Sequence, residues 1–561
     1  MPDKKSTFLR KLVKGILYVF SGLLALFLIL AIYLYCVAID YPPKPKDRSS
    51  EQLQRSEPSP RFYTLKNNWF RKSKSGLYEL YVEGEPYERG VINGKLTKEL
   101  VVRQEDYFTD QIAKMIPSSF YRSFLKYFVA WFDRKLDKNV TEEDKEEIYG
   151  ISESAAAKYQ YIGSNYQRIL NYHAAHDIGH ALQGMALVGC TSFGTWDARS
   201  ADSTMIIGRN MDFYVNDDFA REKIVAFYNP AQGHKFMTVT WGGFIGAVSG
   251  MNEKGLSVTI NAAKSTVPTS AATPVSLVAR EILQYAENIK EAIAIAKKRK
   301  MFVSESFLIG SAEDKKAIII EKTPDTLDVY DPNSNFIVCA NHYQGNLLVK
   351  SKGNTEQLNN SASLYRYNHL MDLLSHDDKN TVQKTVDILR NSKGQNNTDI
   401  GLGNEKAINQ FISHHAIVFE PEKLKVWVST SPWQLGKFVC YDLKKVFALR
   451  GMKKDQEICD STLNIAPDTF LNTPAYKNLV AYRSMLHRIS DGKKINPDSL
   501  ILVNPQYYNA YASAGDYVFK EKQYGKARNY YQIALTKVIA TKEEEASIRK
   551  KLVNCNKKLS D

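Results

Sequence analysis

Cysteine is scarce in this sequence, with six residues among 561. Cys36 lies in an apolar segment near the N-terminus, and the other five are widely scattered. Small proteins that depend on disulfides carry cysteine at a much higher density. The sequence therefore does not encode a disulfide framework, and each cysteine has to be considered for its own chemistry.

Motifs for nucleotides and nucleic acids are also missing. We find no glycine-rich phosphate loop, zinc-finger spacing or single-strand-binding motif, although the net charge is +14. A basic balance of this kind also suits a protein held close to anionic lipid. We therefore expect no nucleic acid as a partner. With 561 residues, 44% of them hydrophobic, the chain has room for two or more domains and a large core.

The N-terminus combines a basic segment with a long uncharged one. Residues 1–15 contain five lysines and arginines, and the 23 residues at 16–38 contain no charge. A helix needs roughly 20 apolar residues to span a bilayer, and the apolar core of a cleaved signal peptide is usually shorter. Tyr35 before Cys36 is also unsuited to lipoprotein processing. A buried core helix is the less fitting alternative.

We therefore predict an uncleaved signal anchor at residues 16–38. The basic tail of residues 1–15 should stay in the cytoplasm, which places the catalytic part outside the cytoplasm, in the cell envelope. Residues 39–75 are predicted to be a linker, because prolines alternate there with charged residues and serines, a composition that does not build a core.

Residues 76–189 are expected to be a helical pro-segment. They open with a strand, a turn at residues 84–86 and a helix start punctuated by glycine. His173, His176 and His180 share a helical spacing, but no nearby carboxylate or cysteine set completes a metal site, so we expect structural histidines and no metal. Aromatic side chains also recur at helical spacing, which indicates a core face or a lipid-binding face, and we favour the core. These are Phe120, Phe124, Tyr127, Phe128 and Trp131.

The residues around Cys190 carry the clearest chemical pattern. An apolar approach at residues 185–188 leads to Gly189 and Cys190, and a polar turn follows. A short apolar run at residues 205–207 then leads into Gly-Arg-Asn-Met-Asp at residues 208–212. This pattern predicts a strand, a hairpin and a second strand, which brings Arg209 and Asp212 back beside Cys190.

A cut between Gly189 and Cys190 would give this hairpin a catalytic function. Cys190 would then carry a free α-amine, whose reference pKa of about 8 lets it act as a base toward the thiol. Arg209 would favour the thiolate, and Asp212 would orient the ammonium. A buried structural thiol is the usual alternative for a lone cysteine, but the length of the surrounding pattern favours a nucleophile.

The order Cys190, Arg209-Asn210, Asp212 resembles the N-terminal-nucleophile amidohydrolases, which include choloylglycine hydrolases, acid ceramidases and penicillin acyltransferases. The pattern Gly-x-Pro-Tyr-Glu-x-Gly-x-x-x-Gly at residues 84–94 is similar to the entry motif of the penicillin acyltransferase branch. The resemblance implies an α+β fold, an αββα sandwich that cuts itself before the cysteine. It also implies a hydrolase β-chain at residues 190–455 that needs no cofactor and no metal.

Further site residues follow from this resemblance. Asn261 matches an active-site asparagine, and Asn341 matches an asparagine that helps to bind the oxyanion, where an amide donor contributes about 3 kcal/mol. Acid ceramidases place a glutamate after the first asparagine, whereas this chain has Ala262, so its pocket departs from theirs. Arg366 matches a second arginine of the site, and a solvated helix arginine is an equal alternative.

The chain changes character near residues 455–475. Residues 475–490 and 543–558 are predicted to form helices, and the segment between them has the small and large residues of one tetratricopeptide repeat. A single repeat cannot bury its own face. Residues 474–561 are therefore expected to be either a partner-binding module or a helical cap on the enzyme.

Together these features predict a membrane-anchored, self-processing amidase that hydrolyses an N-acyl amide through a thioester. An acyltransferase that passes the acyl group to an amine is the closest alternative, and a catalytically inactive scaffold is the alternative from another class. An N-acylated lipid or amino acid is the expected substrate, ahead of bile-salt-like and peptide substrates. The expected site comprises Cys190, Arg209, Asp212, Asn261, Asn341 and Arg366, with the cut between Gly189 and Cys190.

Overall fold

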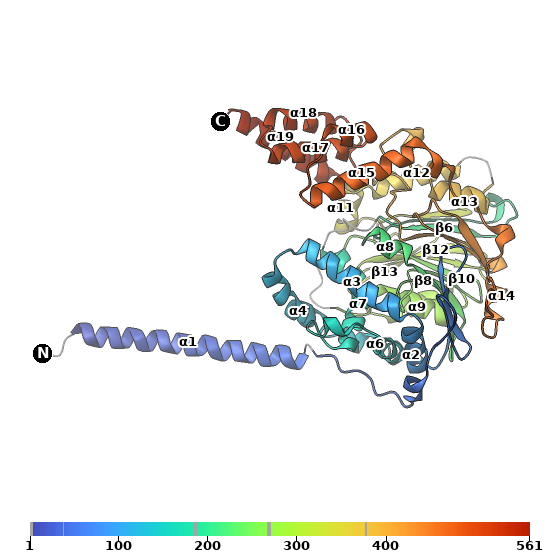
Figure 1. Cartoon of the computed structure of the whole chain (residues 1–561), viewed down its shortest axis with the longest axis horizontal. Coiled ribbons are helices and arrows are strands. Elements are labelled where there is room, and N and C mark those ends of the chain that lie inside the picture. The colour runs from blue at the N-terminus through green and yellow to red at the C-terminus, as the bar shows by residue number, and fades with distance from the viewer. Residues whose placement is uncertain (1–3, 38, 183–188, 266–270, 376–378, 561) are drawn as a thin grey trace.

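The computed structural model describes residues 4–37, 39–182, 189–265, 271–375 and 379–560, and it contains two stacked β-sheets with helices around them (Figure 1). The larger sheet has 11 strands in the order β1-β2-β3-β4-β7-β8-β9-β10-β11-β12-β13. Only β4 and β7 pair in parallel within it. The bounds are β1 Ser56–Ser59, β2 Phe62–Leu65, β3 Asn68–Lys72, β4 Tyr78–Gly84, β7 Ile224–Pro230, β8 Phe236–Thr240, β9 Ser249–Asn252, β10 Leu256–Ala262, β11 Glu305–Ser311, β12 Lys316–Lys322 and β13 Leu327–Tyr330.

The smaller sheet has six antiparallel strands in the order β14-β5-β6-β15-β16-β17. Side chains of the two sheets meet in one buried apolar layer, with Trp69, Met237 and Leu308 from the larger sheet and Ile207 and Phe419 from the smaller. The bounds of its strands are β5 Thr191–Thr195, β6 Ile206–Met211, β14 Phe336–Cys339, β15 His415–Glu420, β16 Lys425–Ser429 and β17 Phe438–Asp442.

Helices cover the outer faces of both sheets. α9 and α10 pack on the larger sheet, and α12 and α13 pack on the smaller one. This α+β architecture agrees with the predicted fold class. The helix bounds are α1 Lys4–Val37, α2 Pro86–Leu96, α3 Lys98–Met115, α4 Ser119–Asp133, α5 Leu136–Asn139, α6 Glu142–Ser152, α7 Asn165–Leu182, α8 Asp217–Arg221, α9 Val275–Tyr285, α10 Ile289–Lys298, α11 Lys352–Asn360, α12 Ser363–Ser375, α13 Val382–Leu389, α14 Leu443–Phe447, α15 Pro474–Ser490, α16 Asp498–Val503, α17 Tyr508–Lys520, α18 Tyr524–Ala534 and α19 Lys542–Ser560.

The glycine motif at residues 84–94 allows two helices to cross closely. A Cβ atom at Gly90 on α2 would lie 2.1 Å from the backbone oxygen of Glu147 on α6, so only glycine fits there. The buried carboxylate of Glu147 accepts hydrogen bonds from Arg89 at 2.5 Å and from Arg280 of α9 at 2.6 Å. This buried ion network ties the segment before Cys190 to the helices of the larger sheet.

α1 differs from the rest of the described chain in its exposure. Its stretch Arg10–Cys36 is long and apolar enough to cross a membrane, and none of it is buried. The helix extends away from the folded body (Figure 1). This length and composition fit a membrane anchor or a signal sequence.

The prediction of a linker through residue 75 is wrong for residues 56–72. Strands β1 to β3 lie there and form one edge of the larger sheet. Trp69 and Phe70 of β3 are buried. Pro58 lies in β1, an edge strand, and Pro60 follows it directly. Edge strands tolerate proline because the position that lacks an N–H can face away from the neighbouring strand.

The prediction that the aromatic stripe of α4 faces the core is wrong for four of its five residues, whereas Trp131 is partly buried against a core cluster. Phe120, Phe124 and Tyr127 are 67%, 58% and 54% exposed, and Phe128 is 44% exposed. Among the aromatic residues of α4, only Phe132 near its end is fully buried. Helical spacing shows that these side chains share one face, but it does not show what that face contacts.

Several smaller predictions can be compared directly. His173 is structural, as predicted, since its ring accepts the Ile245 N–H at 3.0 Å and contacts the Ile169 oxygen at 2.8 Å. No cluster among the described residues suits a metal ion. The side chains of His176 and His180 and the predicted apolar approach at residues 185–188 lie outside the described residues.

The C-terminal helices α15 to α19 form a small unit with its own apolar core. The helices predicted at residues 475–490 and 543–558 are confirmed as α15 and α19. The unit docks on the loop before β15, because Asn504 exchanges two hydrogen bonds with the backbone of Leu402 and Asn404 donates to the Val538 oxygen at 2.8 Å. It therefore packs against the two-sheet body, as expected for a helical cap.

Candidate functional site

The predicted hairpin is confirmed and holds the nucleophile candidate beside its arginine. β5 and β6 pair in antiparallel fashion with Ser192 opposite Arg209. Cys190 lies just before β5, and Asp212 lies just after β6. The Nη2 atom of Arg209 lies 3.5 Å from the Sγ atom of Cys190 and donates to it.

The thiol of Cys190 is 1% exposed and belongs to an apolar cluster that includes Phe213, Phe219 and Trp241. Burial raises the pKa of the Cys190 thiol, and the charge of Arg209 opposes this shift. The guanidinium of Arg209 is fixed because it also donates to the backbone oxygens of Val248 and Ile260. In the uncut chain the thiol is therefore neutral and shielded from water.

The carboxylate of Asp212 is fully buried. Burial raises the pKa of Asp212 to about 6, and the hydrogen bond from Ser413 and the charge of Arg366 partly oppose this shift. Asp212 Oδ2 accepts from the Nε2 atom of Gln410 at 3.0 Å. Its backbone oxygen accepts the N–H of Gly189 at 3.1 Å. Asp212 is thus a titratable group placed beside the peptide bond that would be cut.

Gln410 is a site residue that the sequence analysis missed. Its Nε2 atom donates to the carbonyl oxygen of Gly189 at 2.9 Å as well as to Asp212. A Cβ atom at residue 189 would lie 2.7 Å from this nitrogen, so the glycine leaves room for the amide. Gln410 lies far from the hairpin in sequence and in an irregular loop, and its own neighbours give no signal of this role.

Arg366 reaches the site from the first turns of α12. Its Nη1 atom donates to the Cys190 oxygen at 2.8 Å and to Thr191 Oγ1 at 2.6 Å. Its Nη2 atom donates to Asn341 Oδ1 at 2.7 Å. These contacts of a buried side chain favour the site position over the solvated alternative.

The two asparagines also lie at the site but differ in what their amides contact. Asn261 donates to the backbone oxygens of Cys339 and Ala340 at 3.0 and 3.2 Å, which uses both of its amide hydrogens. Asn341 donates to the Ala262 oxygen at 2.9 Å, which uses one hydrogen. The structure thus brings all six predicted residues together, and it gives Asn261 a bridging position between β10 and the end of β14.

Glu305 is a second residue that the analysis missed. It lies directly opposite Ala262 in the pairing of β10 with β11. Its side chain is fully buried, and neither carboxyl oxygen has a hydrogen-bond partner among the described residues. Burial raises the pKa of Glu305 well above its usual range, although the nearby Arg209 opposes the shift. In the sequence, the signal that could have found Glu305 is its position, a glutamate just before the apolar run at residues 307–309.

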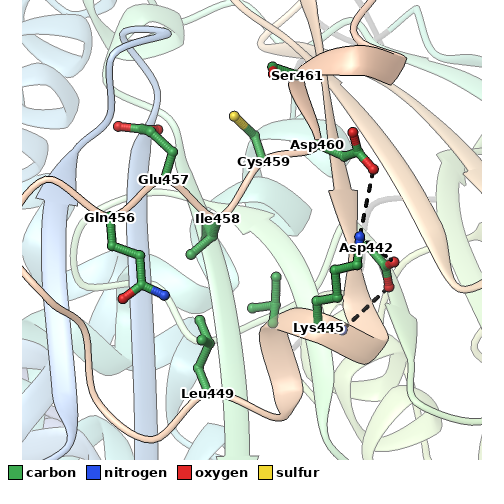
Figure 2. A pocket seen from close by; sticks show the side chains of 10 residues that line it. Asp442, Lys445, Leu449, Gln456, Glu457, Ile458, Cys459, Asp460 and Ser461 are labelled. Atoms are coloured by element: carbon green, nitrogen blue, oxygen red, sulfur yellow. Dashed lines mark hydrogen bonds and ion pairs between the residues drawn. The ribbon is translucent and has the colours of Figure 1, made fainter.

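A separate hollow of about 360 Å³ lies at the far edge of the smaller sheet, lined by side chains of residues 442–461 (Figure 2). Lys445 lies within it, 3.6 Å from Asp442 and 3.8 Å from Asp460. Burial raises the pKa of Cys459 there. Because β17 is four strands away from β5, and neighbouring strands lie about 4.8 Å apart, this hollow is not part of the Cys190 site.

Comparison with known families identifies the region that contains this geometry. Residues 199–431 match the family described as acyl-coenzyme A:6-aminopenicillanic acid acyl-transferase. This match covers about two fifths of the chain and agrees with the resemblance to the N-terminal-nucleophile amidohydrolases. The match to this family begins shortly after Cys190 and includes Arg209, Asp212, Asn341 and Arg366.

Individual relatives are distant. An uncharacterised protein of Archaeoglobus fulgidus is 24% identical over 338 residues, which cover 54% of this chain and 55% of that protein. An N-acylethanolamine-hydrolyzing acid amidase of Caenorhabditis elegans is 25% identical over 232 residues, covering 39% of this chain and 62% of the amidase. A solved structure described as a Caenorhabditis elegans N-acylethanolamine-hydrolyzing acid amidase ortholog is also similar; the match covers 42% of this chain and 93% of that chain, with 18% identity and a TM-score of 0.30. This chain thus covers less than two thirds of either curated relative.

Proposed function

We propose that this chain cuts itself between Gly189 and Cys190 and then hydrolyses an N-acyl amide with Cys190 as the nucleophile. The observation that carries the proposal is the position of Gln410, which contacts both the Gly189 carbonyl and the Asp212 carboxylate beside the buried thiol. Buried carbonyl oxygens generally accept a hydrogen bond, and here the donor is a side chain that also contacts the Asp212 carboxylate. This donor suits a bond whose oxygen becomes negatively charged during attack.

The first step needs a base other than an α-amine, because Cys190 has none before the cut. We assign this role to the carboxylate of Asp212, which interacts electrostatically with the thiol. It takes the thiol proton while sulfur attacks the Gly189 carbonyl carbon, and Gln410 donates to the resulting oxyanion. The C–N bond then breaks, the nitrogen of Cys190 takes the proton back, and water hydrolyses the thioester. The products are a carboxylate at Gly189 and a free thiol and amine on Cys190.

In the mature enzyme the new α-amine serves as the base. Arg209 favours the thiolate because its guanidinium lies 3.5 Å from the sulfur. Asp212 orients the ammonium. The side-chain oxygen of Asn341 is held by Arg366, and its amide nitrogen supplies a hydrogen to the substrate oxyanion. The oxyanion role of Asn261 stays a prediction, and the contacts of its amide with the ends of β14 support a positioning role instead.

The expected substrate is an N-acylated lipid or amino acid. The apolar residues grouped with Cys190 suit an acyl chain, and one relative is named for hydrolysis of N-acylethanolamines. Incubation of the purified protein with a labelled N-acylethanolamine, with and without an added amine, tests the reaction. Release of free labelled acid supports the hydrolase. Transfer to the amine that outpaces this release favours the acyltransferase, and no turnover of an uncut chain favours the inactive scaffold.

The membrane topology and the division of the chain into functional parts are also proposals. We infer that α1 anchors the protein with its basic end in the cytoplasm and the catalytic region outside. The cut would leave residues 76–189 on the N-terminal fragment that carries α1, as its pro-segment or α-chain, and residues 190–455 would form the catalytic chain. Residues 474–561 would act as a helical cap that supports the loop of Gln410, with a tetratricopeptide-like partner site as the second possibility.

Replacement of Gln410 by alanine should slow self-cleavage by about 10²- to 10³-fold, because one oxyanion donor is lost. Pulse labelling followed by a denaturing gel measures the conversion of precursor to fragments. Gln434→Ala is a matched control, since Gln434 is an equally buried amide that donates to the Leu389 oxygen instead. Equal cleavage rates in the two variants would refute the assigned role.

A further inference from the structure

Helix α4 presents a continuous aromatic face outside the core. Phe120, Tyr121 and Phe124 are 67%, 68% and 58% exposed, and Phe128 continues the same face one turn further along. Single exposed apolar residues are common in proteins, but a contiguous patch of this kind marks a surface that binds an apolar partner.

The apolar helix α1 passes along one side of this face. A hollow of about 320 Å³ lies between the two helices, and both contribute only apolar or aromatic side chains to it. α4 also lies close to the end of α1 in the overall view (Figure 1). The lining residues are Leu30, Tyr33 and Leu34 of α1 and Tyr127, Phe128 and Trp131 of α4.

The point on α1 at which α4 makes contact determines how deep α4 would lie in a bilayer that α1 spans. The uncharged run ends at residue 38, and α1 contacts α4 through Leu30, Tyr33 and Leu34. At 1.5 Å per residue, these contacts lie about 6–12 Å inside the end of the run. Amphipathic helices at membrane surfaces bury their apolar faces by about 5–10 Å, so the two depths agree.

We propose that α4 lies in the surface of the same bilayer that α1 spans, with its aromatic face inserted at the boundary of the acyl chains. The proposal rests on the anchoring role of α1. Tyrosine and tryptophan suit this layer because their rings are apolar and their polar atoms reach water. The exposed side chains of Lys114, Lys135 and Lys138 flank the helix and match anionic headgroups.

The helix before α4 packs against the cluster that contains the nucleophile candidate. Phe108 of α3 stacks on Tyr172 and contacts Phe219, with ring centroids 5.5 and 6.2 Å apart. Phe219 belongs to the same apolar cluster as Cys190. Packed aromatic side chains therefore extend from α3, the helix before α4, to the apolar cluster of Cys190.

Depth-dependent quenching of a fluorescent label tests the proposal on the full chain. Cys36→Ser and Cys459→Ser remove the two cysteines that are not buried, and Phe124→Cys introduces the labelling site. The protein is placed in phosphatidylcholine–phosphatidylglycerol vesicles, with nitroxide-bearing lipid or aqueous iodide as the quencher. A label at Leu502→Cys, a position 79% exposed on α16, is the matched control.

The label at residue 124 should lose more than half of its emission to the lipid quencher and little to iodide, and the label at residue 502 should show the reverse. Equal lipid quenching at both positions would overturn the docking of α4. Protection of residue 124 from both quenchers would also overturn it, because another protein surface would then cover the helix. Flotation of the vesicles under alkaline conditions checks α1 separately. Protein that fails to float contradicts the anchor, whereas floating protein with an unquenched label contradicts only the docking.

Discussion

The Cys190→Ala variant is expected to remain a single uncut chain and to lose at least about 10⁴-fold in amide hydrolysis, as in enzymes whose nucleophile is removed. Sulfur is the atom that attacks both the Gly189 carbonyl and the substrate. Without it, Arg209 and Gln410 have no reacting partner, and the α-amine needed for turnover never forms. A denaturing gel and release of labelled acid measure the two losses together.

Cys339→Ala is the matched control for this variant. Cys339 is equally buried and ends β14 near the same site, but its side chain belongs to the apolar layer between the sheets. The Cys339→Ala variant should cleave itself and turn over substrate, with a modest loss of thermal stability. If Cys190→Ala still yields two fragments divided at Gly189, the assignment of the nucleophile is wrong.

The Asp212→Asn variant should slow self-cleavage by about 10²- to 10⁴-fold, the usual contribution of a positioned acid or base. Burial raises the pKa of Asp212 to about 6 in the uncut chain. The carboxylate is therefore the main form above pH 6, and the neutral acid is the main form below it. The cleavage rate of the wild-type precursor should rise with pH through about 6, and that step should be absent in the variant.

A rate measurement across this pH range separates the role in catalysis from a role in folding. Asp133→Asn provides the control, because burial also raises the pKa of Asp133 and this residue lies on α4, outside the site. That variant should keep the wild-type pH step. If Asp212→Asn keeps the same step as well, another group supplies the base.

The local part of the site could be predicted from the sequence. Arg209 and Asp212 lie close to Cys190 along the chain, and one hairpin with a two-residue side-chain period places them. The family pattern added Asn341 and Arg366, which come from distant elements. The glycines at residues 84–94 were also recognised, and the structure explains them by the close crossing of α2 and α6.

The long-range partners could not be predicted in the same way. Gln410 reaches Gly189 because the C-terminal unit and β15 hold its loop, and no local spacing records that contact. Glu305 meets Ala262 through strand register, which the sequence alone does not determine. The exposed face of α4 shows a further limit, because its periodicity is the same whether the partner is a core or a membrane.

The most direct test of the account is the identity of the N-terminus in the purified, active protein. Intact mass and N-terminal sequencing should find a fragment that begins at Cys190 and continues to the C-terminus, together with a fragment that ends at Gly189. A fully active protein that consists only of the uncut 561-residue chain would contradict the account, because Cys190 would then have no free amine to serve as its base.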